Sequence, residues 1–170
     1  MKKFRVQNVA VPLLGVCLVL VVALPAFAHV PGRMTGGGSI KVPGVGRVTH
    51  GFELHCIFPE GAAAQEPNNL EINWGGGQNF HLTTLTTGEC SDNPNIEEFP
   101  PEAGFDVFTG SGTGTLNQVE GYTITFRLTD AGEPGINDRA LFVIRDPEGN
   151  VVLNTGPRLL RRGNHQAHAN

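Results

Sequence analysis

Apolar and polar residues alternate with a period of two over several stretches of this chain, and a helical period is almost absent. The clearest stretch is residues 122–129, which read YTITFRLT. A second is residues 48–58, in which Phe52, Leu54 and Cys56 share one face and Glu53 and His55 the other. Successive side chains of a strand point to opposite faces of the sheet. The pattern therefore predicts half-buried β-strands.

Turn residues separate these stretches along the whole chain. The sequence contains 23 glycines and 12 prolines, and residues 146–150 (DPEGN) form a strong turn signal before the apolar Val151 to Leu153. Many short strands with frequent turns are typical of an all-β sandwich. We expect a single β-sandwich of two sheets, with an Ig-like or jelly-roll-like architecture, and a hairpin around residues 146–150.

The N-terminal segment has the organisation of a signal peptide. Lys2, Lys3 and Arg5 precede an apolar run from 9 to 24, and residues 25–28 (PAFA) form a small-x-small cleavage site. The run is shorter than the roughly 20 residues of a membrane-spanning helix. We expect residues 1–28 to be a cleaved signal peptide and residues 29–170 a single domain in a secreted, periplasmic or extracellular location. The alternative is an uncleaved segment, which would be the only contact with a membrane.

Removal of residues 1–28 would leave nine basic and sixteen acidic residues. An acidic domain of this kind argues against a nucleic-acid partner, because phosphate backbones are bound by basic patches. Arg158, Arg161 and Arg162 lie close together near the C-terminus, and we interpret them as charges that keep an edge strand soluble.

Two of the three cysteines, Cys56 and Cys90, follow the predicted cleavage site. In an oxidising compartment an isolated pair usually forms a disulfide. The alternative is two free buried thiols. A redox-active pair is not expected, because the chain has no CxxC motif.

The order of several motifs resembles a known family, the secreted bacterial β-sandwich domain named post-COAP-1. The matching segments are residues 33–40, 48–56, 68–74, 80–82, 110–115 (GSGTGT), 129–138 (TDAGEPGIND) and 163–168 (GNHQAH). The resemblance implies a β-sandwich with a Cys56–Cys90 bridge and a final strand after Gly163. The family has no assigned enzymatic activity, so the resemblance supplies no catalytic residues.

One loop has the composition of a calcium site. Asp130, Glu133, Asn137 and Asp138 offer oxygen ligands within nine residues shaped by glycine and proline. Calcium prefers six to eight oxygen ligands in flexible loops, and it is the cofactor that this loop suggests. Asp and Asn also stabilise turns through their own backbone, so a purely structural loop is the alternative.

The histidines suggest a less specific metal hypothesis. Cleavage after Ala28 would make His29 the mature N-terminus, where its α-amine and imidazole together form a copper chelate. His50 and His55 lie an odd number of residues apart, as do His165 and His168, so neither pair shares a strand face. Convergence of histidines from different strands remains open.

No catalytic residues are predicted, because the hydrolase, metalloprotease and phosphate-binding motifs are all missing. Trp74 and Tyr122 fall on apolar faces, which favours core packing over sugar stacking. We therefore expect a non-enzymatic binding or structural module of the cell exterior, whose partner is a surface protein or a polysaccharide. The runner-up is a metal-dependent function, either calcium-stabilised adhesion or carbohydrate binding, or copper binding at His29.

Overall fold

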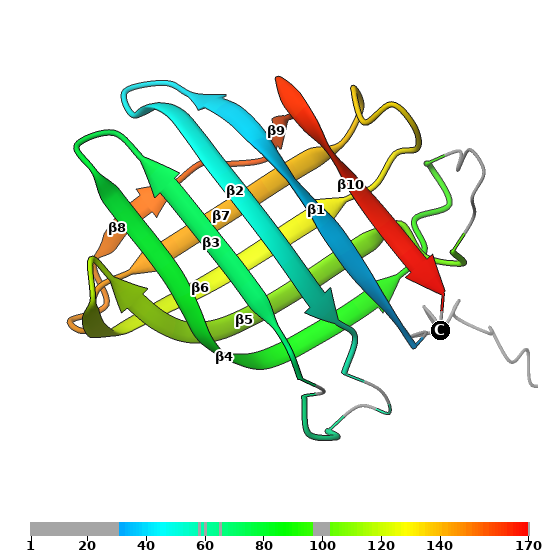
Figure 1. The fold of residues 1–170 in the computed structure, drawn as a ribbon, viewed down its shortest axis with the longest axis horizontal. Helices are drawn as coiled ribbons and strands as arrows, with labels where there is room; N and C mark the ends of the chain where they lie inside the picture. Colours follow the sequence, from blue (N-terminus) through cyan, green and yellow to red (C-terminus); the bar gives the residue numbers. More distant parts are fainter. Residues whose placement is uncertain (1–30, 58, 60, 65, 97–102, 170) are drawn as a thin grey trace, which may run out of the picture.

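A computed structural model describes residues 31–57, 59, 61–64, 66–96 and 103–169, and all regular structure in these residues is β-strand (Figure 1). The strands are β1 (Gly32–Val42), β2 (Gly46–His55), β3 (Asn69–Trp74), β4 (Gln78–Ser91), β5 (Val107–Leu116), β6 (Val119–Thr129), β7 (Arg139–Arg145), β8 (Val151–Asn154), β9 (Arg158–Leu159) and β10 (Arg162–Ala169). The predicted hairpin joins β7 to β8, and the predicted final strand is β10.

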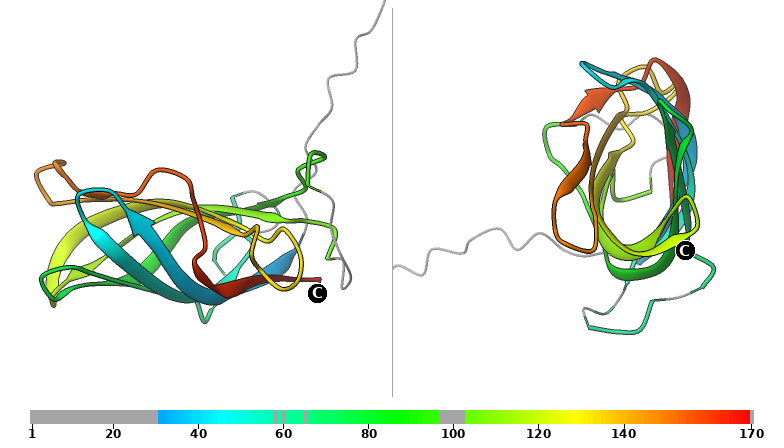
Figure 2. Two further views of the ribbon diagram at one scale, coloured as in Figure 1. Left: turned by 90° about the horizontal axis from the view of Figure 1, so that it is seen from above. Right: turned by 90° about the vertical axis from the view of Figure 1, so that its left-hand side faces the viewer.

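These strands form one antiparallel sheet in the order β10-β1-β2-β3-β4-β5-β6-β7-β8, with β9 paired to β7. The sheet folds over on itself, so that β10, β1, β2 and β3 face β5, β6 and β7 as two walls around the core (Figures 1 and 2). Long β4 bends between the walls at two register shifts, Leu82/Thr84 and Leu85/Thr87, since bulges increase local twist and bending. The predicted all-β sandwich is confirmed, with the difference that its two layers belong to one continuous sheet.

The core is filled by the apolar residues of the alternating stretches. Phe80, Phe108, Phe126 and Phe142 are fully buried between the walls. The glycines of the GSGTGT segment make room for these rings: a Cβ atom at Gly110 would meet the ring of Phe126, and one at Gly114 would meet the ring of Phe80. The glycines at every second position of β5 are therefore a packing feature.

Strand β9 connects the two walls at one end of the sheet. It pairs with β7 in one wall, and the chain then continues into β10, which pairs with β1 in the other. The amide of Leu160 donates to the carbonyl of Asp138 (2.9 Å) and the amide of Arg161 donates to the carbonyl of Ser39 (2.7 Å). These bonds hold the β9–β10 connection against both walls and bring together side chains from β1, β2, β7 and β9.

Candidate functional site

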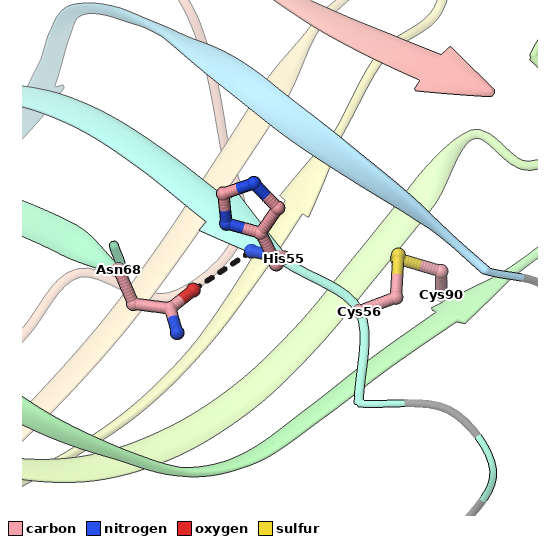
Figure 3. The surroundings of a disulfide bond; sticks show 4 residues. All are labelled: His55, Cys56, Asn68 and Cys90. Atoms are coloured by element: carbon pink, nitrogen blue, oxygen red, sulfur yellow. Dashed lines mark hydrogen bonds between the residues drawn. A yellow bond between two sulfur atoms is a disulfide. The ribbon is translucent and has the colours of Figure 1, made fainter. Parts of the chain in front are cut away.

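The predicted disulfide between Cys56 and Cys90 is confirmed. Cys56 follows the end of β2 and Cys90 lies on β4, with 5.6 Å between their Cα atoms (Figure 3). The amide of Ile57 donates to the carbonyl of Gly88 (2.7 Å). The segment that follows β2 therefore pairs directly with β4, past the first residue of β3. Next to the bridge, the Asn68 side-chain oxygen accepts a hydrogen bond from the His55 amide (2.8 Å). Cys56 and Cys90 thus have a structural role.

A pair of buried histidines lies between the walls. His50 of β2 and His165 of β10 are 6% and 0% exposed, and their Nε2 atoms are 2.8 Å apart. The rings contact Phe52 and Phe142, whose ring centroids lie 5.0 Å from His165 and 5.1 Å from His50 respectively. Histidines from different strands therefore do converge, on β2 and β10 rather than within one strand.

Two glycines of β1 lie opposite the two histidines. Strand β1 lies between β2 and β10, with Gly38 opposite His50 and Gly36 opposite His165. The two imidazoles therefore extend from the strands on either side of β1. A Cβ atom at Gly38 would meet the carbonyl oxygen of Arg162, and one at Gly36 would meet that of Asn164. Gly36 and Gly38 therefore permit the close approach of β10 to β1.

The hydrogen bonds assign the tautomers of the pair. His165 Nδ1 lies 3.1 Å from the carbonyl oxygen of Thr129, which only accepts, so Nδ1 carries the proton and Nε2 accepts from His50 Nε2–H. Burial, with a smaller contribution from the nearby His165, lowers the pKa of His50 to about 3. Burial likewise lowers the pKa of His165 to about 4, opposed by its bond to Thr129. Both rings are neutral at pH 7.

The candidate calcium loop holds the open edge of β10. The carboxylate of Asp138 accepts hydrogen bonds from the amides of Ala131 (2.9 Å) and His165 (2.7 Å). The carboxylate of Asp130 accepts bonds from the amides of Gly132 (2.9 Å) and Ala167 (2.8 Å). The amides at 165 and 167 point to the same side of β10, so the two carboxylates bind the strand edge much as a neighbouring strand would.

The other two candidate ligands differ in their contacts. Glu133 Oε1 accepts a bond from the Asn164 side-chain amide (2.7 Å), and Asn137 is exposed. Among the residues that the structure describes, no group of three or more His, Cys, Asp or Glu side chains is placed to hold a metal ion. The contacts of Asp130 and Asp138 match the structural alternative for this loop, and calcium binding stays a prediction. His29 lies outside the described residues.

Asp138 is an unusual carboxylate because it is fully buried. Burial raises its pKa to about 6, and nearby Asp130 and Glu133 act in the same direction, whereas the amide bonds from Ala131 and His165 act against it. Near neutral pH it is therefore close to its titration range.

The surface beside β9 is hollowed and basic. One depression of about 500 Å³ is lined by Lys41, Ile136, Arg139, Pro157, Arg158, Leu159, Leu160 and Arg161. A second of about 350 Å³ is lined by Ser39, Ile40, Lys41, Gly46, Arg47, Arg161 and Arg162. The two depressions share Lys41 and Arg161, and no acidic residue of the described part of the chain lines either. We call them together the basic groove.

The cations of the basic groove have no acidic partner among the described residues. Its six cations are Lys41, Arg47, Arg139, Arg158, Arg161 and Arg162. Within the described part of the chain, the ion pair found joins Arg33 to Glu53, outside the groove. All six are exposed except Arg158, which is half-buried and donates to the carbonyl of Thr155 (2.9 Å).

Two of these cations face each other directly. Lys41 of β1 and Arg47 of β2 are register partners, and both are exposed. Like charges directly opposite in an antiparallel pair are destabilising. The three arginines near the C-terminus were predicted to protect an edge strand. That role does not account for Lys41, Arg47 or Arg139, which lie on strands with neighbours on both sides.

The groove could not be predicted from the sequence, because its cations come from four separate segments of an acidic chain. Trp74 and Tyr122, by contrast, are half-buried and pack against the core, as expected. The threonines of the outer faces of β4 and β6, among them Thr83 and Thr123, are exposed.

Comparisons with known proteins add no family assignment: no family model, no curated protein and no solved structure matches this chain. The described residues also contain no helix that is long and apolar enough to cross a membrane.

Proposed function

We propose that this chain is an exported, non-enzymatic binding module of the cell exterior, and that it binds an anionic partner through the basic groove. The observation that carries the proposal is the direct Lys41–Arg47 pair within a cluster of six cations that no described acidic residue neutralises. Such a cluster costs stability through mutual repulsion. An anionic ligand would offset that cost on binding.

Export is supported by the signal-like segment at residues 1–28 and by the Cys56–Cys90 disulfide, which is typical of oxidising compartments. The resemblance to the post-COAP-1 domain agrees with the all-β fold. Both histidines of the buried pair are held in structural contacts, so the groove is the better place for a ligand.

The test is retention of the purified, oxidised protein on beads that carry carboxylated dextran, with neutral dextran as the comparison. We expect retention on the anionic beads alone and a steep loss of retention between 50 and 300 mM salt, because salt screens exposed charges.

Lys41→Glu is the informative variant, since it places a carboxylate in both depressions and should abolish retention. The matched control is Arg33→Gln with Arg145→Gln, which removes two exposed cations outside the groove. Equal retention of Lys41→Glu and the wild-type protein would contradict the proposal, and so would equal binding to neutral dextran.

A further inference from the structure

We infer that the ligand of the basic groove is a linear acidic polysaccharide that lies across both depressions, an inference that rests on the proposed function. The first support is the layout of the charges. Arg139 and Arg158 belong to one depression, Arg47 and Arg162 to the other, and Lys41 and Arg161 to both. A single small anion would need one cluster, whereas two adjoining clusters fit a chain with repeated acidic groups.

The chemistry of the cations favours carboxylate, sulfate or phosphate groups. Five of the six are arginines, and the planar guanidinium can bind two oxygens of such a group at once. Arg47, Arg139, Arg161 and Arg162 are exposed, so their donors are open to a ligand that approaches from solvent.

The uncharged part of the lining argues against single-stranded nucleic acid. Among the described residues, no Phe, Tyr or Trp lines either depression, whereas grooves for single-stranded nucleic acid combine cations with aromatic side chains that stack on the bases. The apolar residues are aliphatic: Ile136 and Leu159 are 69% and 44% exposed and line the first depression. With no aromatic side chain to stack on a sugar ring, an acidic polysaccharide would be held through its anionic groups by the cations of both depressions.

The experiment is calorimetric titration of the oxidised protein with galacturonic acid and with its linear dimer, tetramer and octamer. Joining acidic units turns the second contact into an intramolecular event and raises its effective concentration. We expect the octamer to bind at least about tenfold more tightly per molecule than the dimer. A neutral octamer of glucose should not bind.

Two double variants separate the halves of the groove. Arg139→Gln with Arg158→Gln affects the first depression, and Arg47→Gln with Arg162→Gln affects the second. Each should reduce the affinity for the octamer about tenfold and remove most of the dependence on length. Arg33→Gln with Arg145→Gln is the matched control, and the melting temperature of each variant checks that it is folded.

The outcomes separate this inference from the proposed function. If galacturonic acid binds as tightly as the octamer, the groove is a simple anion site: the polysaccharide inference fails and the proposed function stands. Tighter binding of a duplex oligonucleotide or of phosphatidylglycerol vesicles than of the octamer, at equal charge concentration, would also overturn the inference. If none of these anions binds, both proposals fail.

Discussion

Lowering the pH from 7 to 5 should destabilise the folded chain by about 2 to 3 kcal/mol, because two buried histidines take up protons only after unfolding. The pKa is lowered by burial to about 3 for His50 and to about 4 for His165, against about 6.5 in an unfolded chain. The stability that the neutral pair contributes is therefore present above pH 6.5. It is lost as the pH falls from 6.5 toward 4.

The magnitude follows from the difference between the pKa of an unfolded histidine, about 6.5, and the assay pH of 5. At about 1.4 kcal/mol per pH unit, each histidine costs about 2 kcal/mol at pH 5. Asp138 acts in the opposite direction: its pKa is raised by burial to about 6. Between pH 7 and pH 5 the folded state therefore takes up a proton that the unfolded state does not. This uptake raises the free energy of unfolding by about 1 kcal/mol.

The assay is urea denaturation at pH 7 and pH 5, followed by the fluorescence of Trp74, the single tryptophan. The variant is His50→Gln with His165→Gln, which cannot titrate in this range. Because Asp138 still takes up a proton in the folded state, the stability of this variant should rise by about 1 kcal/mol between pH 7 and pH 5. Equal stability of the wild-type protein at both pH values would refute the reasoning, and so would the same 2 to 3 kcal/mol loss in the variant.

Three further predictions concern the basic groove, the loop and the disulfide. Lys41→Glu should stabilise the fold by about 0.5 to 1 kcal/mol while it weakens binding, because the repulsion between residue 41 and Arg47 becomes attraction. A lower melting temperature for this variant would contradict the claim that the cations of the groove repel one another. Asp138→Asn should destabilise the fold by about 2 to 3 kcal/mol through loss of a charged hydrogen bond, whereas Asn137→Ala in the same loop should not. If excess calcium raises the melting temperature of the wild-type protein and not of Asp138→Asn, the loop is a metal site as well as a structural contact. Reduction of the disulfide at Cys56 should lower stability in urea by about 3 to 4 kcal/mol on the chain-entropy model, and an unchanged midpoint would contradict that role.

The strands could be predicted from local alternation, because the apolar positions in each strand mark the face that the strand buries. Residues 122–129 alternate in the sequence and lie in β6, with Ile124, Phe126 and Leu128 buried. The continuity of the sheet could not be predicted in this way. It depends on the bend of β4 at its register shifts, which responds to packing between distant strands.

The contacts of the polar residues depend on long-range register. His50 and His165 are 115 residues apart and meet only because β1 pairs with both of their strands. Asp130 and Asp138 have the composition of a calcium loop, and only the position of β10 reveals that they bind its amides.

The most direct test of the proposed function is to map where an acidic oligosaccharide binds. Titration of the 15N-labelled protein with the galacturonate octamer can be followed by the shifts of its backbone amides. We expect the shifts to concentrate at residues 39–47, 136–139 and 158–162, which line the basic groove. Absence of shifts, or shifts confined to the outer threonine face of β4 and β6, would contradict the account.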